Sequence, residues 1–279
     1  MQITIEDLVG VCPATMAPNE SIFDAILPQI DYETARTRGI VTPELFDSLD
    51  DIEDRVQNPN YERLCALGLN VRKYICATAL IRQIPSLDLV LTPTGFGVVS
   101  NQNVAPASAE RVRSLTNELR YQADRYLDEI LDGMRSMCDV TRSTMADDFV
   151  TLFWKTDHVR LFGHPHPTRN DLDERMPKII PASMKIRELI SPELYDALIK
   201  EEAKDALPPA RGKLVDLCRR AIVGYCNNDY TAEMFTRSIL LFLEDNIDYL
   251  PEYYDSRTFE ARRKLRYENE KDDPCFFFG

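Results

Sequence analysis

An internal duplication constrains the fold of this chain more than any other sequence feature. Residues 24–49, DAILPQIDYETARTRGIVTPELFDSL, align without a gap with residues 173–198, DERMPKIIPASMKIRELISPELYDAL, and nine of the 26 positions are identical. Chance similarity between two amphipathic helices explains part of such a match, but not an ungapped block of this length. The match continues downstream with small shifts, for example at Cys76 and Cys226. The sequence therefore predicts one structural module that occurs twice.

Both copies carry the signals of α-helices. Apolar residues recur at spacings near 3.6 within 61–83 and 108–137 of the first copy and within 231–249 of the second. A further helix is expected over 21–38, with Ser21 as its N-cap. Thr42 is expected to cap a short helix that begins at Pro43, and residues 191–193 repeat this chemistry. The expected fold class is mainly α, with two duplicated helical-bundle modules.

The first copy contains about 27 additional residues that do not look helical. Short β-type runs at 88–91 and 96–100 flank the turn sequence TPTG, so a β-hairpin with an extended arm is expected at about 85–107. A lone hairpin is marginally stable in water and needs a surface to pack on. That surface is either the bundle of the same chain or a neighbouring subunit. The residues expected at an intersubunit contact are Leu91, Pro93, Gly95, Phe96, Val98, Val99, Asn101 and Asn103.

The predicted organisation has four parts. Residues 1–139 form module 1, residues 140–170 connect the modules, residues 171–255 form module 2, and residues 256–279 form a C-terminal tail. The tail ends in PCFFFG after a charged spacer. Three consecutive phenylalanines left in water promote aggregation, so a tethered peptide that docks on another subunit is expected. Folding of the tail back onto its own bundle is the alternative. The docking residues are Cys275, Phe276, Phe277, Phe278 and Gly279.

Catalytic signatures are missing from the sequence. The chain has no GxGxxG, GxxxxGK[ST], HExxH or GxSxG motif, so no enzymatic activity and no cofactor are expected. The three histidines, His158, His164 and His166, do not have the spacing of a metal site, and no metal is expected. A metal-dependent accessory hydrolase that uses these histidines remains an alternative function. The seven cysteines include no CxxC pair and are expected to be reduced and mostly buried.

The charge and hydropathy of the chain limit its partners. A net charge of −13 argues against general nucleic-acid binding. No uninterrupted apolar run approaches the roughly 18 residues that cross a bilayer. The leading residues MQITIEDLVGV lack the pattern of a secretory signal, so synthesis and assembly in the cytoplasm are expected.

The run LVLTPTGFGVVSNQNVAPASAERV at 89–112 resembles a segment of structural proteins encoded by phages and prophages of gut Bacteroidetes. The stretch from FVTLFWKTDHVRLFG to ISPELYDALIKEEA is similar to the second half of those proteins. The opening ITIEDL, followed by an amphipathic helix, also resembles the start of helical head–tail connector proteins, the neck adaptors of tailed phages. The resemblance covers most of the chain, and TPTGFGVVSNQNVAPAS is its most specific part.

This resemblance implies a virion component that assembles in the bacterial host cytoplasm. Connector proteins form rings between the portal and the tail, and their terminal segments dock onto the portal. The implied partners are other copies of this chain, the portal protein, and tail or neck proteins. Genomic DNA would pass without specific binding, and no membrane would be involved. A duplicated module departs from the usual single-module adaptor. A tail-completion or tail-terminator protein, or a cytosolic scaffold unrelated to phage particles, would also fit the sequence.

Overall fold

The computed structural model describes residues 1–12, 20–50, 57–86, 89–92, 95–98, 108–137, 142–203 and 206–265. The chain divides into two compact units, Met1–Ala146 and Asp147–Gly279, here called unit 1 and unit 2. Both units are built mainly from α-helices, as the periodicity of the sequence predicts. Each unit is described by itself.

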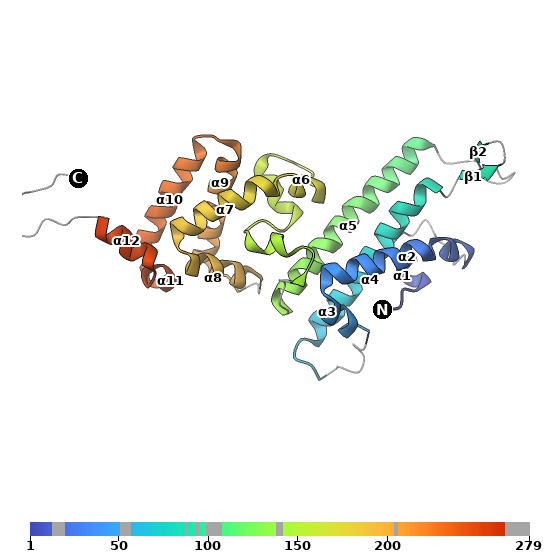
Figure 1. Ribbon diagram of the computed structural model, residues 1–279, viewed down its shortest axis with the longest axis horizontal. Helices are drawn as coiled ribbons and strands as arrows, with labels where there is room; N and C mark the ends of the chain where they lie inside the picture. The colour runs from blue at the N-terminus through green and yellow to red at the C-terminus, as the bar shows by residue number, and fades with distance from the viewer. Residues whose placement is uncertain are drawn as a thin grey trace, which may run out of the picture. The chain divides into compact units, whose positions relative to one another are not determined.

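A long central helix organises unit 1. The helices of this unit are α1 (Ile5–Val11), α2 (Glu20–Val41), α3 (Pro43–Ser48), α4 (Tyr61–Gln83) and α5 (Ala109–Met137). Helix α4 packs against α5, α2 and α1, and Figure 1 shows α4 and α5 running side by side. Val71 and Ile75 of α4 are fully buried, as the apolar stripe over 61–83 predicts. The core of unit 1 therefore lies around α4.

A buried acid joins two helices of this bundle. The side chain of Glu33 on α2 is fully buried. Its carboxylate accepts hydrogen bonds from Arg82 of α4 and, at 3.1 Å, from Arg36 one turn further along α2. The two guanidinium groups supply the counter-charge that a buried carboxylate requires. Glu33 is therefore a structural contact between α2 and α4.

A two-stranded hairpin lies between α4 and α5. It follows the short turn η3 (Ile84–Ser86) and consists of β1 (Leu89–Thr92) and β2 (Gly95–Val98). The strands are antiparallel, with Leu91 opposite Phe96 and Leu89 opposite Val98. In the part of the chain that the structure describes, this sheet contains these two strands and no third. Figure 1 shows the hairpin beyond the end of α4 and the start of α5.

A second central helix organises unit 2. Its long helices are α7 (Met176–Ile190), α8 (Pro192–Ala203), α9 (Pro209–Asn227) and α10 (Thr231–Asp245). The short elements are η5 (Ala146–Val150), which spans the boundary with unit 1, η6 (Thr156–Phe162), α6 (Arg169–Asp173), η7 (Ile247–Tyr249), α11 (Pro251–Tyr254) and α12 (Arg257–Leu265). Helix α9 packs against both α10 and α7 (Figure 1).

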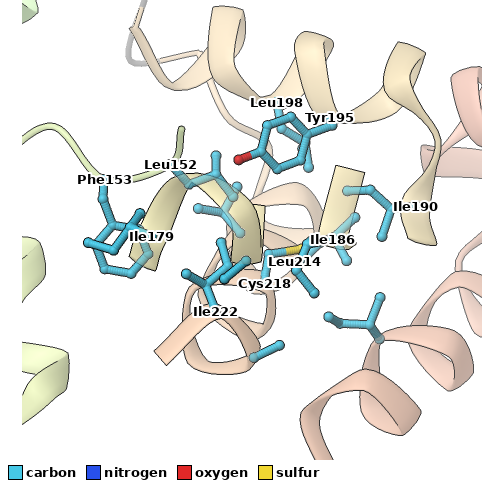
Figure 2. Packing of buried hydrophobic residues seen from close by; sticks show 14 of the residues in the cluster. Leu152, Phe153, Ile179, Ile186, Ile190, Tyr195, Leu198, Leu214, Cys218 and Ile222 are labelled. Carbon is cyan, nitrogen blue, oxygen red and sulfur yellow. The ribbon is translucent and has the colours of Figure 1, made fainter. Parts of the chain in front are cut away.

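The core of unit 2 draws on residues from most of its elements. Figure 2 shows Ile179 and Ile186 of α7, Tyr195 of α8, and Cys218 and Ile222 of α9 in one cluster. All five side chains are buried. Leu152 and Phe153, which precede η6, complete the cluster in the same view. The segment before α6 is therefore part of the core.

The structure corrects two predicted boundaries. The connecting segment predicted at 140–170 is not a separate part, because the chain belongs to unit 2 from Asp147 onward and Trp154 is buried there. The tail predicted at 256–279 begins with α12, which packs on α7 and α11. Arg262 of α12 donates a hydrogen bond to the carbonyl oxygen of Leu189 at 2.9 Å. Tertiary contacts decide both boundaries, since they bury Phe153 and Trp154 in the first segment and attach α12 to α7 and α11 in the second.

The structure also corrects two predicted helix caps. Helix α2 begins at Glu20, so Ser21 is inside the helix and is not its N-cap. Thr42 precedes α3 but its side chain makes no capping hydrogen bond. Its backbone has the unusual angles φ 74° and ψ 140°. Ser191 has similar angles, φ 81° and ψ 144°, yet its hydroxyl accepts the backbone N–H of Leu194 at 3.2 Å.

Replacing Gly224 with alanine is expected to destabilise the protein by about 1–3 kcal/mol, the usual cost of overpacking. Gly224 is buried in α9 where α10 begins, and an added Cβ would lie 2.7 Å from Cα of Ala232. Gly212 is the matched control on the same helix, since a Cβ there meets nothing within 4 Å. Gly212→Ala should raise stability by about 0.5–1 kcal/mol through helix propensity. Equal urea midpoints for the two variants would contradict this close approach of α9 and α10.

Candidate interaction surface

Only part of the predicted contact surface lies within the described residues. Leu91 is in β1, and Gly95, Phe96 and Val98 are in β2. The other predicted hairpin and arm residues, and the predicted docking tip, lie outside the described residues: Pro93, Val99, Asn101, Asn103, Cys275, Phe276, Phe277, Phe278 and Gly279. The strands therefore place four of the predicted residues next to one another. The role of the others stays a prediction.

Exposed apolar residues that no predicted site includes lie in the second half of α10 and in the turn after it. Leu241 is 56% exposed, and Ile247 and Tyr249 in the following turn η7 are 56% and 57% exposed. These three residues are here called the α10 patch. The sequence does contain a signal for it, because the run FTRSILLFLED is too apolar for one buried stripe. A helix that is apolar around most of its circumference needs a second partner.

A shallow groove runs between α9 and α10 in the same unit. Its volume is about 520 Å³, within the range of ligand and peptide pockets. Phe242 lines it from α10, next in sequence to Leu241 of the patch. From the first half of α9 it is lined by Pro209, Gly212, Lys213, Asp216 and Leu217. The groove therefore combines apolar side chains with one cation and one carboxylate.

A buried arginine fixes the position of the groove relative to the patch. Arg211 on α9 is 7% exposed, and its Nε donates to the carbonyl oxygen of Tyr249 at 3.0 Å. Its two terminal nitrogens donate at 2.5 Å to Glu201 of α8 and at 2.6 Å to Glu252 of α11. One guanidinium thus joins α8, α9, η7 and α11, so the start of α9 and the α10 patch lie at the same end of unit 2.

Opposing effects act on one carboxylate of this cluster. Burial raises the pKa of Glu201, the positive charge of Arg211 opposes that rise, and the charge of Glu252 adds to it. The net direction is upward, which shows that desolvation exceeds the attraction of the arginine. The cluster is therefore a structural ion network in which Arg211 and Glu252 shift the pKa of Glu201 in opposite directions.

The three histidines do not form a common site. Nδ1 of His158 accepts the backbone N–H groups of Trp154 and Lys155 at 3.3 and 3.4 Å. Nε2 of His164 is 2.6 Å from a terminal nitrogen of Arg175, and His166 is exposed. Within the described ranges, no three side chains of His, Cys, Asp or Glu gather as metal ligands would. The geometry gives the hydrolase hypothesis no centre in these ranges.

The segment around Trp154 is held by arginines. Trp154 is 1% exposed, and the guanidinium of Arg219 lies 5.4 Å from its ring centroid. Nε of Arg219 donates to the carbonyl oxygen of Leu152 at 2.9 Å. Arg169 donates to the carbonyl oxygen of Trp154 at 3.2 Å, and the ring of His158 packs edge-on at 4.9 Å. These contacts show that the histidine-containing segment stabilises unit 2.

The described cysteines are reduced thiols, and most of them are buried. Cys12, Cys76, Cys218 and Cys226 are buried and Cys65 is partly exposed. Burial raises the pKa of Cys76 to about 12 and that of Cys226 to about 11. Thiols with such values stay protonated near neutral pH and react slowly. They pack as small apolar side chains.

One helical segment has the length and composition of a membrane span. It covers Tyr61–Ser86, which includes α4, and its mean hydropathy reaches 1.4 over 18 residues. Charged residues such as Arg72 and Lys73 interrupt its apolar residues, so the segment contains no long uninterrupted apolar run. About 56% of this window is buried inside unit 1. Its contacts with α1, α2 and α5 are those of a core helix.

Comparison with known proteins finds a match within unit 1. A family of unknown function, DUF6712, matches residues 38–137. The matched range begins near the end of α2 and includes α3, α4, the hairpin and α5. No curated protein and no solved structure matches the chain. The hairpin between α4 and α5 therefore falls inside a segment that is similar to a protein family.

Proposed function

We propose that this chain is a virion structural protein, a head–tail connector or neck adaptor that assembles as a ring between portal and tail. Its sequence resemblance to phage structural proteins motivates the proposal. The observation that carries it is the hairpin, whose sheet has only two strands among the described residues. The outer edges of β1 and β2 carry backbone groups that a strand from a neighbouring subunit would pair with. Such pairing would order the subunits of a ring.

We also infer that the two units are copies of one module, and their corresponding helices support this. The α2–α3 junction at Thr42 and the α7–α8 junction at Ser191 have nearly equal backbone angles with positive φ. A non-glycine residue rarely adopts such angles, and here both residues precede a proline. Two copies of one module are expected to share such a conformation at equivalent positions of the alignment.

An ion pair recurs across the same junction in both units. Arg38 on α2 pairs with Asp47 on α3 at 2.6 Å, and Arg187 on α7 pairs with Asp196 on α8 at 2.9 Å. The four residues occupy equivalent positions in the ungapped alignment of 24–49 with 173–198. In both units the next long helix, α4 or α9, is the central one. A duplicated module would present two related surfaces per chain and so reduce the number of chains in a ring.

The proposed contact with the portal uses the C-terminal tip, residues 275–279. Its phenylalanines are chemically suited to anchor in an apolar pocket of a ring protein at the capsid vertex. The net charge of −13 suits a channel wall, because DNA passes it without being retained. Membership of the virion, assembled in the host cytoplasm, follows from this proposal.

Tailed particles from cells that produce this protein are expected to contain the chain in a fixed ratio to the portal protein. A variant that lacks residues 274–279 should fold normally but be absent from the particles, because its anchor is missing. Quantitative mass spectrometry of gradient-purified particles measures both quantities, and circular dichroism verifies the fold. The matched control replaces Glu268 and Glu270 with glutamine, which changes the spacer but keeps the phenylalanines.

Separate results would contradict the virion function and the docking through the C-terminal tip. If the unmodified chain is missing from purified particles, the virion function is wrong. If the truncated chain enters particles as well as the control variant does, docking through the tip is wrong while the virion function stands.

A further inference from the structure

The α9–α10 groove and the α10 patch both leave large apolar side chains uncovered in unit 2. Leu217 and Phe242, which line the groove, are only partly buried, and Leu241, Ile247 and Tyr249 of the patch are more than half exposed. Uncovered apolar side chains at one end of a small unit favour a binding surface there. An apolar segment of matching size is needed to cover it.

We propose that the C-terminal phenylalanines of the same chain, Phe276–Phe278, occupy this groove before the chain meets any partner. The groove is thus an internal docking site, and the tail is stored there in the unassembled molecule. The inference does not depend on the virion function, because it concerns the isolated chain.

The length of the tail permits this contact. Phe276 lies eleven residues after Leu265, the last residue of α12. An extended chain of this length spans about 36 Å at roughly 3.3 Å per residue. A compact unit the size of residues 147–279 has a radius of gyration of about 14 Å. The extended tail is therefore more than twice as long as this radius and can reach well across the surface of the unit.

The geometry of unit 2 shortens the path. Helix α11 is bonded to both helices that form the groove, because Glu252 pairs with Arg211 of α9 and the hydroxyl of Tyr254 donates to the carbonyl oxygen of Leu243 on α10. Helix α12 begins three residues after α11 ends and packs on it. The chain therefore leaves the described part of unit 2 from α12, which packs on the helix that is bonded to α9 and α10.

The chemistry of the two surfaces is complementary. Gly212 lines the groove without a side chain, and an added Cβ there meets nothing within 4 Å, so this part of the lining is open. Lys213 on the rim offers a cation to the rings and to the spacer. That spacer, YENEKDD at 267–273, carries four carboxylates and one lysine. The groove's own carboxylate, Asp216, is paired with Arg220 at 2.8 Å and so repels the spacer less.

Photocrosslinking of the full chain tests the proposal. Phe277 is replaced with benzoylphenylalanine, the purified protein is irradiated, and the crosslinked peptides are identified by mass spectrometry. We expect crosslinks to the peptides that contain Leu217 and Phe242. A mixture of ¹⁵N-labelled and unlabelled chains separates the two possible sources of the tail. If every crosslinked pair of peptides carries the same isotope label, the tail and the groove belong to the same chain, as proposed. Crosslinked pairs that carry both labels would show that a second copy supplies the tail, and they would overturn the proposal.

Two variants show whether the groove itself is the acceptor. Leu217→Glu should lower the crosslink yield by about tenfold, because a carboxylate in the apolar groove is costly to desolvate. Gly212→Leu adds an apolar side chain to the lining of the groove, at a position where an added Cβ meets nothing within 4 Å, and should have the same effect, which covers the case in which Leu217→Glu does not fold. Met234→Glu is the control, since Met234 is 48% exposed on α10 but does not line the groove. Unchanged yields in both groove variants, or crosslinks that map elsewhere, would overturn the proposal.

Discussion

Replacing Arg211 with methionine is expected to lower the free energy of unfolding by about 3 kcal/mol or more, because it removes one partner from a buried ion network. The variant leaves the carboxylates of Glu201 and Glu252 facing each other without a cation. It also leaves the carbonyl oxygen of Tyr249 without its donor. Urea denaturation followed by circular dichroism measures the loss.

The matched control for this prediction is Arg220→Met on the same helix. The pair of Arg220 with Asp216 is about half exposed on both sides, so its loss should cost less than about 1 kcal/mol. Adding Glu201→Gln and Glu252→Gln to Arg211→Met should restore part of the stability, since it removes the uncompensated charges. Equal effects of Arg211→Met and Arg220→Met would show that the network contributes no more than a surface pair.

The pH dependence of the Arg211→Met effect has a defined sign. Burial raises the pKa of Glu201, so this carboxyl binds its proton at higher pH in the folded chain than in the unfolded chain. Removing Arg211 takes away the charge that opposes this rise. The loss of unfolding free energy in Arg211→Met, relative to the unmodified chain, is therefore largest near neutral pH. It shrinks as the pH falls and Glu201 becomes neutral.

Replacing Trp154 with alanine is expected to destabilise the protein by about 3–5 kcal/mol, the range for deleting a large buried aromatic side chain. The ring is 1% exposed and packs against Arg219 and His158, so the variant leaves a cavity beside a guanidinium. Trp154→Phe keeps part of the packing and should cost less. Because Trp154 is the chain's single tryptophan, unfolding is followed by circular dichroism rather than by fluorescence.

The control for this prediction is Tyr230→Ala, because Tyr230 is 80% exposed. Its replacement should change the stability by less than about 0.5 kcal/mol. A loss for Trp154→Ala as small as that of Tyr230→Ala would mean that residues 147–162 do not belong to the core of unit 2.

Periodicity in the sequence predicts the long helices well. The expected range 61–83 coincides with α4, and 108–137 differs from α5 by one residue. These helices are long and have a stripe of buried residues, so the 3.6-residue period is repeated often enough to be read. The strands of the hairpin lie within two residues of the expected runs, because turn residues bound them on both sides.

The sequence pattern fails where tertiary contacts decide the structure. Leu152, Phe153 and Val159 are buried, yet they lie in irregular backbone and short 3₁₀ turns that have no helical period. The prolines and histidines nearby suggest a linker, and only packing against α7–α9 reveals the core. The backbone conformation of Thr42 is a further example. The sequence around Thr42 is typical of a helix cap, and it does not reveal that φ is positive.

The candidate surfaces differ in how far they can be predicted. The hairpin and the phenylalanine tip are visible as local sequence anomalies. The α9–α10 groove is not, because it forms between residues far apart in the chain, such as Leu217 and Phe242, and depends on how closely two helices pack. Exposure of Leu241, Ile247 and Tyr249 likewise depends on which side of α10 the rest of unit 2 covers.

The backbone angles of Thr42 and Ser191 have a mechanical consequence. Conformations of this kind cost on the order of 1–3 kcal/mol each and persist only where the surrounding structure holds them. An ion pair spans each of the two bends, from Arg38 to Asp47 and from Arg187 to Asp196. These pairs are largely exposed and add little, but Thr42 and Ser191 themselves are buried, at 4% and 0% exposure. Rotation about either bend would bring a buried residue into water, so neither bend is expected to behave as a hinge.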